Sequence, residues 1–287
     1  MDHVGYVLTS GLVAVTGAAG YLGNEVMRAL KSLGLDSVGL ARRAGDSIIA
    51  CDLLDRSRLR DVLREMQPRC VIHCAWETPK SAGDYADVSS GERGLSIIDS
   101  LLDATRAPVI YASSMTVYGQ NSGQVARSES DAGAPESAYG LAKWRAERLF
   151  EDRGAKGFAA RLPGLFGGQR KAGLVWAAID ALERGELPTL PKYPVMWAGA
   201  DVRDVAKALA QLCVEQPMGF TAINLGYSGV HSVSHLVETL SQVYGVDIPY
   251  EIKHPEFAFD LELAASHGLI IENDLRSAVL RLKDEWK

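Results

Sequence analysis

The sequence has 287 residues and a formal net charge of −6, with 47% hydrophobic and 23% charged residues. This composition is typical of a folded globular chain and excludes a disordered one, and the slightly acidic balance without a basic run excludes an electrostatic footprint for nucleic acid. No apolar stretch approaches the ~20 residues that span a bilayer, and the first eleven residues lack the basic start and apolar core of a secretion signal, so we expect no membrane partner and a cytoplasmic location.

Short apolar runs alternate with helical patterns through the first two thirds of the chain. Apolar runs predict buried strands at 12–16, 37–41, 47–51, 70–75, 108–113 and 157–162. Helical patterns lie between them at 21–33, 58–66, 91–105 and 137–151. Strands that alternate with helices indicate an α/β fold, a doubly wound parallel sheet of the Rossmann type with helices on both faces.

The character of the sequence changes after residue 162, where prolines and glycines become frequent. Further helical patterns follow at about 171–184, 202–215, 232–244 and 273–285. We therefore expect a main domain over residues 1–165 and a small C-terminal lobe over 166–287, parts of which return to the main domain. The four cysteines, at 51, 70, 74 and 213, fit neither the spacing of a zinc site nor a disulfide framework, so no metal is expected.

The stretch "VTGAAGYLG" joins the first predicted strand to the first predicted helix. Its residues Gly17, Gly20 and Gly23 have the spacing G-x-x-G-x-x-G. Backbone N–H groups at the start of a helix can hold a pyrophosphate when side chains stay out of the way. The loop therefore predicts a dinucleotide site, and its residues Ala19, Tyr21 and Leu22 belong to the expected contacts.

The second strand ends in a pair of arginines. A dinucleotide-binding unit commonly carries an acidic residue about 20 positions after its loop, to bind the ribose 2′-hydroxyl, but here Arg42 and Arg43 stand there. Two cations suit a 2′-phosphate, which favours NADP over NAD; the alternative is a solvated surface pair. Asp52, with Leu53 beside it, is a candidate contact to the adenine, or Asp52 caps a turn.

Tyr139 and Lys143 form a Y-x-x-x-K pattern inside a predicted helix, which places both side chains on one face. A nearby ammonium, together with a positively charged nicotinamide, favours the phenolate of a tyrosine and makes it an acid–base group. Ser114, in "YASSMTVYG", follows a predicted central strand, at the edge where parallel sheets bind ligands. We predict that Ser114, Tyr139 and Lys143 are catalytic.

Together these motifs resemble the extended short-chain dehydrogenase/reductase family, the NAD(P)-dependent epimerases, dehydratases and keto-reductases that modify nucleotide sugars. The resemblance rests on T-G-A-A-G-Y-L-G, C-D-L, V-I-H-C-A, Y-A-S-S-M-T-V-Y-G, Y-G-L-A-K and R-L-P-G-L-F-G, collinear over residues 12 to 170. It implies that Ala75 passes close to a ribose of the cofactor and that Lys143 binds the nicotinamide ribose. It also implies that Pro163 and Gly164 lie near the nicotinamide amide. The C-terminal lobe is then the substrate-binding lobe.

Departures from the family pattern narrow the reaction. Family dehydratases carry an acidic residue just after the active-site hydroxyl, where this chain has Met115 and Thr116, so dehydration is disfavoured. Hydride transfer at one carbon remains. The arginine pair favours an NADP-dependent ketoreductase acting on a nucleotide-activated keto-sugar. The alternatives are an NAD(P)-dependent nucleotide-sugar 4-epimerase and a non-catalytic NADP-binding regulator.

The substrate contacts are less well defined by the sequence. The asparagine and arginine that often bind the nucleotide in this family are missing, and Lys192, Arg203 or Arg170 are candidates for a diphosphate, unless the substrate carries no nucleotide. Residues on the expected substrate-facing loops are Trp76, Glu77, Met115 and Trp197. The resemblance also implies a homodimer that pairs the helices 91–105 and 137–151.

Overall fold

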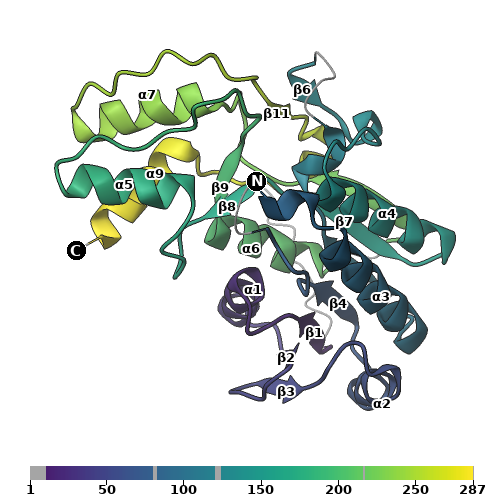
Figure 1. Cartoon of the computed structure of the whole chain (residues 1–287). Helices are drawn as coiled ribbons and strands as arrows, with labels where there is room; N and C mark the ends of the chain where they lie inside the picture. The colour runs from purple at the N-terminus through teal and green to yellow at the C-terminus, as the bar shows by residue number, and fades with distance from the viewer. Residues whose placement is uncertain (1–10, 80–82, 120–123, 216, 287) are drawn as a thin grey trace, which may run out of the picture.

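A computed structural model of the chain describes residues 11–79, 83–119, 124–215 and 217–286. Seven strands form one sheet in the order β10-β7-β5-β4-β1-β2-β3 (Figure 1). Every pair of neighbouring strands in it is parallel. The strands are β1 Val13–Thr16, β2 Ser37–Ala41, β3 Ile48–Ala50, β4 Cys70–His73, β5 Val109–Ala112, β7 Gly157–Arg161 and β10 Phe220–Asn224. The predicted doubly wound α/β fold is confirmed.

Helices cover both faces of this sheet. The apolar cluster on one face includes side chains from α2, α3 and α4, and the cluster on the other face includes side chains from α1 and α6 (Figure 1). These helices are α1 Tyr21–Ser32, α2 Arg56–Met66, α3 Val88–Ala104, α4 Ala138–Asp152 and α6 Val202–Leu212. All four residues of β1 are buried, as a strand covered on both faces requires.

Helix starts follow from capping side chains. The Asp55 side chain accepts a hydrogen bond from the Arg58 N–H, and the Asp87 side chain accepts one from the Ser89 N–H. Each aspartate satisfies a backbone donor that the helix leaves free, so α2 and α3 begin two and three residues before their predicted starts.

The strand predicted at 70–75 ends at His73 in the structure. Beyond it, Cys74 and Ala75 leave the sheet and pass against the glycine loop, where a Cβ atom on Gly17 would lie 2.8 Å from the Ala75 nitrogen. The end of β4 is thereby brought next to the first βα turn.

Residues beyond 165 contribute to two parts of the molecule. Strand β10 is an edge strand of the main sheet and α6 packs on α1, whereas α5, α7 and α9 lie together in a separate group of helices (Figure 1). The remaining elements are η1 Gly83–Ala86, η2 Met115–Tyr118, η3 Glu129–Asp131, β6 Ala126–Arg127, β8 Gly164–Phe166, β9 Gly199–Asp201, β11 Ala258–Phe259, α5 Leu174–Glu183, α7 Val233–Tyr244, α8 Glu262–Ser266 and α9 Leu275–Glu285. The division at residue 165 stays a prediction.

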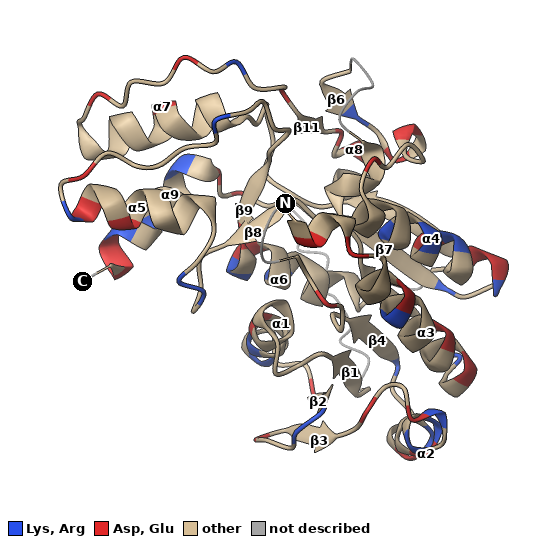
Figure 2. Ribbon diagram, in the orientation of Figure 1, with Lys and Arg blue, Asp and Glu red and all other residues tan. Residues whose placement is uncertain are grey.

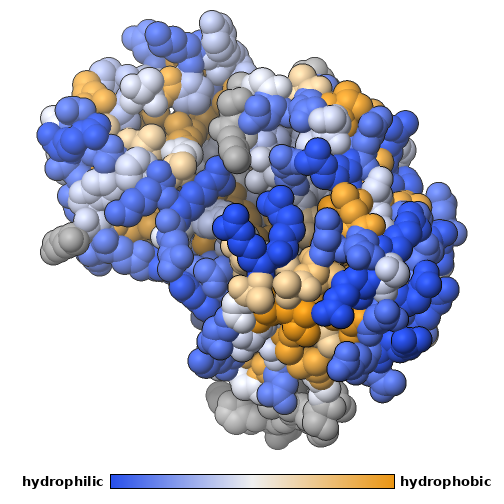
Figure 3. All heavy atoms as spheres, turned by 60° about the horizontal axis from the view of Figure 1, so that its bottom comes forward, coloured by the Kyte–Doolittle hydropathy of each residue, from blue (hydrophilic) through white to orange (hydrophobic). Residues whose placement is uncertain are grey.

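Charged side chains lie mainly on the helices. Strands β1, β4 and β5 contain no Lys, Arg, Asp or Glu, whereas α2 and α4 carry many (Figure 2). The face shown in Figure 3 is mostly hydrophilic, with several separate apolar areas. Within the described residues, none of the helices is both long and apolar enough to span a membrane. The homodimer and the cytoplasmic location stay predictions.

Candidate active site

The glycine loop connects β1 to α1 and has little room for side chains. A Cβ atom on Gly23 would lie 2.2 Å from the Gly17 carbonyl oxygen, and Gly17 has a positive φ of 70°. Gly20 is the N-cap of α1 without a side-chain cap, and the first helical turn contains no acidic residue. The turn thus leaves backbone N–H groups free at a twelve-residue helix, which fits the pyrophosphate of a dinucleotide.

The side chains of the loop point to different surroundings. Ala19 is exposed and Leu22 packs against the core. The Tyr21 hydroxyl donates to the Gly167 carbonyl at 3.0 Å, and the Arg170 guanidinium lies 5.4 Å from the Tyr21 ring. Tyr21 therefore ties the loop to the segment after β8, and its contact with a cofactor stays a prediction.

Arg42 and Arg43 follow the end of β2 and are both exposed. Within the described residues neither forms an ion pair, so both guanidinium groups are available to an anion. Asp52 lies beyond β3, and its carboxylate accepts the Leu54 N–H at 3.0 Å, so it caps a turn. Leu53 is buried. Their contacts with a cofactor stay predictions.

Ser114 and Tyr139 lie together at the carboxyl edge of the sheet. Ser114 follows β5 and caps η2, where its hydroxyl oxygen accepts from the Thr116 N–H at 3.2 Å and from the Thr116 hydroxyl at 3.0 Å. Tyr139 lies in the first turn of α4 and is hydrogen-bonded to Ser114. The Tyr85 ring packs edge-on against the Tyr139 ring, with the centroids 5.6 Å apart.

Burial opposes the ionisation of both members of the Y-x-x-x-K pair. It raises the pKa of Tyr139, as does the neighbouring Tyr85, while the hydrogen bond with Ser114 lowers it. Burial also lowers the pKa of Lys143 to about 7, against the opposing effects of Cys74 and Glu147. The Lys143 ammonium donates to the Ala112 carbonyl at 2.7 Å. Ionisation of Tyr139 is thus favoured by nearby positive charge, whereas the charged form of Lys143 is favoured by nearby negative charge such as that of Glu147.

A buried polar network supports α4, and the sequence reasoning missed it. Arg161 on β7 donates to the Glu147 carboxylate through Nη2 at 2.7 Å and through Nε at 3.2 Å, and the Ser113 hydroxyl donates to the same carboxylate at 2.5 Å. A signal was present, because Glu147 falls four residues after Lys143 on the same helical face, and Arg161 is a lone charge in an apolar strand.

The predicted cofactor residues beyond β4 and β7 lie beside the same edge. Ala75 touches the glycine loop at Gly17. Pro163 is buried and the Gly164 N–H donates to the Ala198 carbonyl at 2.9 Å. The Met115 N–H donates to the Leu162 carbonyl at 2.8 Å, which holds this segment against Ser114.

Several predicted substrate residues have partners within the protein. Met115 is buried in an apolar cluster with Phe257 and Phe259. The Arg203 guanidinium pairs with Asp201 at 2.6 Å and also with Glu285. These contacts give Met115 and Arg203 structural roles. That the two residues also bind the substrate stays a prediction.

The remaining candidates differ in exposure. Glu77 is exposed and pairs with Arg93 at 2.8 Å. Lys192 is exposed, and Trp197 is half-buried beside Gly199. Trp76 turns inward, with its ring 4.2 Å from the Lys143 ammonium. Lys192 is therefore free to meet a solvent-borne anion, whereas Trp76 faces Lys143.

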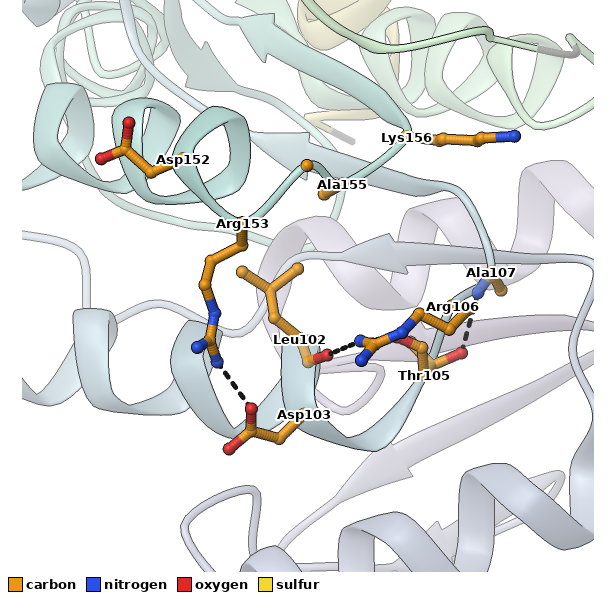
Figure 4. A pocket seen from close by; sticks show the side chains of 10 residues that line it. Leu102, Asp103, Thr105, Arg106, Ala107, Asp152, Arg153, Ala155 and Lys156 are labelled. Carbon is orange, nitrogen blue, oxygen red and sulfur yellow. Dashed lines mark hydrogen bonds and ion pairs between the residues drawn. The ribbon is translucent and has the colours of Figure 1, made fainter.

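A separate pocket of about 590 Å³ lies at the opposite edge of the sheet, before β5 and β7. Figure 4 shows Arg153 paired with Asp103 and Arg106 bound to the Leu102 carbonyl. Because its guanidinium groups already have partners and it faces away from Ser114, this pocket is not part of the candidate site.

Comparisons with known proteins identify the family of the chain. The sequence profile of the NAD dependent epimerase/dehydratase family matches residues 13–226. The chain is 27% identical over 275 residues to a UDP-glucose 4-epimerase of Azospirillum brasilense, covering 83% of this chain and 78% of that protein. It is 30% identical over 158 residues to methionine adenosyltransferase 2 subunit beta of Danio rerio, covering 54% of this chain and 48%, about half, of that protein.

Among solved structures, a UDP-glucose 4-epimerase from Brucella ovis in complex with NAD matches the chain with a TM-score of 0.80. The match covers 95% of this chain and 98% of that one at 23% identity, so it shows a shared fold.

Proposed function

The chain belongs to the NAD dependent epimerase/dehydratase family, and from this premise we propose that it is a dinucleotide-dependent 4-epimerase of a nucleotide sugar. The observation that carries the proposal is the assembly of Ser114, Tyr139 and Lys143 at one sheet edge beside the glycine loop. The likeness to a UDP-glucose 4-epimerase over most of both chains supports the sugar and the reaction.

The protein side chains would handle the proton of this reaction. Tyr139 would take the proton from the C4 hydroxyl of the sugar and return it to the same oxygen after the C4 configuration has inverted. Ser114 would hydrogen-bond that oxygen and orient it, and the charged Lys143 would favour the phenolate of Tyr139. The dinucleotide, when bound, supplies the acceptor and donor of the hydride.

Dehydration is not supported by the side chains around Ser114. The two positions after it are the buried Met115 and Thr116, whose hydroxyl is bound to Ser114. Neither is a carboxylic acid, so neither provides the acid and base that removal of water from a sugar needs.

The relatives favour an epimerase over the ketoreductase that the arginine pair suggested. Arg42 and Arg43 remain the observation that speaks for NADP, whereas the epimerase structure from Brucella ovis holds NAD. The non-catalytic regulator remains a second candidate because of the likeness to a protein named as a subunit of an adenosyltransferase. The presence of both Tyr139 and Lys143 favours catalysis.

The test is incubation of the purified protein with UDP-glucose and with UDP-N-acetylglucosamine in D2O, with NAD, with NADP or with neither added. An epimerase inverts C4 without net consumption of dinucleotide and without exchange of the C4 hydrogen, as proton NMR reads directly. A ketoreductase would instead run its reaction in reverse, reducing NADP to NADPH as it oxidises the C4 hydroxyl of the sugar to a 4-keto-sugar nucleotide. Absence of both reactions would leave the regulator in the lead.

Replacement of both Arg42 and Arg43 by alanine is expected to weaken NADPH binding by roughly tenfold or more, because each charge-assisted hydrogen bond to a phosphate contributes about 1.5–3 kcal/mol. NADH binding should change by less than about twofold, within the small effect of exposed charges. Calorimetric titration of both dinucleotides measures this, with Arg60→Ala, an exposed arginine on α2, as the matched control. Equal loss for both dinucleotides would contradict recognition of the 2′-phosphate.

A further inference from the structure

Three aromatic rings surround the Lys143 ammonium. Its nitrogen lies 4.2 Å from the centroid of the Trp76 ring, 4.8 Å from that of Tyr111 and 5.7 Å from that of Tyr139. Trp76 is the nearest of the three, and tryptophan offers the strongest face to a cation. The ammonium therefore has an aromatic ring as a close electrostatic partner.

The position of Trp76 depends on a glycine of α3. A Cβ atom on Gly94 would lie 2.6 Å from Cη2 and Cζ3 of the Trp76 ring, so only glycine leaves room for the indole there. The ring also tilts against Tyr111, with the centroids 6.0 Å apart. The buried Trp76 Nε1 atom has no hydrogen-bond partner among the described residues. Among the described residues, the ring is thus held beside Lys143 by packing and not by a hydrogen bond of the indole nitrogen.

Among the described residues, the ammonium has one hydrogen bond, to the Ala112 carbonyl. A lysine ammonium carries three donors, so two remain for the hydroxyls of the nicotinamide ribose that the family resemblance assigns to it. Burial disfavours its charged form, since Lys143 is only 2% exposed. A neighbouring group that stabilises the positive charge without accepting a hydrogen bond leaves these two N–H groups available.

We propose that Trp76 is a positioning residue for Lys143. The face of the Trp76 indole holds the Lys143 ammonium charged and in place. The free N–H groups of the ammonium can then engage the cofactor, and its charge can promote ionisation of Tyr139. The role rests on the proposed function, since it assumes that Lys143 serves catalysis. A side chain that merely fills the space between α3 and β5 would depend on the shape of the indole. The proposed role depends also on the electron density of its ring.

Other charged and titratable groups around Lys143 share its electrostatics. They are His73 and Cys74 at the end of β4, Tyr111 on β5, and Tyr139 and Glu147 on α4. A test must therefore change the ring of Trp76 without moving these neighbours.

Fluorinated tryptophan meets this requirement, because fluorine withdraws electron density from the ring with little change of shape. The wild type and the Trp76→Phe variant are each prepared with normal and with fluorinated tryptophan, and no cofactor is added. In Trp76→Phe only the other tryptophans are fluorinated, so this variant shows any effect of their fluorination on Lys143. Carbon-13 NMR then follows the Lys143 side chain through a pH titration, with Lys143→Arg identifying its signal. In the wild type, fluorination should lower the pKa of Lys143 by about half to one unit, and in Trp76→Phe it should change nothing.

Activity gives the second readout. At pH 7 Trp76→Leu should lose roughly fivefold in kcat, because a pKa near 7 that falls by about one unit leaves far less of Lys143 charged. Trp76→Phe should recover part of this loss, and Trp286→Phe, in the separate group of helices, should lose nothing. A Lys143 pKa that ignores fluorination in the wild type, or that responds equally in Trp76→Phe, overturns the inference. A normal fluorine response without any turnover of UDP-sugars would instead overturn the proposed function.

Discussion

Replacement of Tyr139 by phenylalanine is expected to reduce turnover roughly a thousandfold, within the range that a positioned acid–base group contributes. The phenyl ring keeps the edge-on contact with Tyr85 and remains buried, so the fold should be preserved. Only the hydroxyl that is hydrogen-bonded to Ser114 is lost. Dinucleotide binding should stay within about twofold, since the glycine loop is untouched and only one hydrogen bond is removed. Single-turnover kinetics and calorimetry measure the two quantities.

The matched control is Tyr85→Phe, which removes the hydroxyl of the neighbouring tyrosine and keeps the edge-on ring contact. Tyr85 is itself protonated at the acidic limb of the pH–rate profile, because burial raises its pKa, so its loss should leave that limb in place, with kcat near the wild-type value. The limb reports the proton that Tyr139 and Lys143 share as a pair. Undiminished turnover in Tyr139→Phe would refute the acid–base role of Tyr139 and mean that another group moves the proton.

The motifs that act through local backbone geometry are readable from the sequence. The glycine spacing predicts the β1–α1 turn, because at each glycine another part of the backbone lies so close that a Cβ atom would not fit. The Y-x-x-x-K spacing places Tyr139 and Lys143 on one face of α4. Strand alternation similarly predicts a parallel sheet. These features depend on neighbours within a few residues, which one sequence displays.

Contacts between distant segments are not readable in this way. Tyr85 meets Tyr139 across 54 residues, and nothing local to either marks the pair. The sequence places Trp76 on a loop beside the substrate. In the structure its ring instead lies next to the Lys143 ammonium, because Gly94, 18 positions later in α3, leaves room for it there. Arg203 reads as a free cation, although Asp201 and Glu285 both pair with it. Tertiary packing decides each of these positions.

Replacement of Glu147 by alanine is expected to destabilise the protein by about 3–5 kcal/mol, the cost of removing one partner from a buried ion pair. The side chains of Arg161 and Glu147 are 2% and 1% exposed, so the guanidinium would be left charged in a site that water does not reach. At about 2–4 °C for each kcal/mol in a chain of this size class, Tm should fall by roughly 10 °C. Denaturant unfolding and thermal unfolding measure both quantities.

Glu151→Ala on the same helix is the matched control, because it removes the carboxylate of an exposed ion pair and so separates the effect of burial from the effect of losing a charge. Glu151 also pairs with an arginine, Arg148, at 2.6 Å, but these side chains are 36% and 41% exposed, so its loss should cost less than about 1 kcal/mol. Equal losses for the two variants would mean that the Glu147–Arg161 pair behaves as a surface pair. A larger loss at Glu147 has a catalytic consequence as well, because its carboxylate binds Ser113, next to Ser114, and helps to keep Lys143 charged. The network then both holds α4 against the sheet and favours the charged form of Lys143 on the same helix.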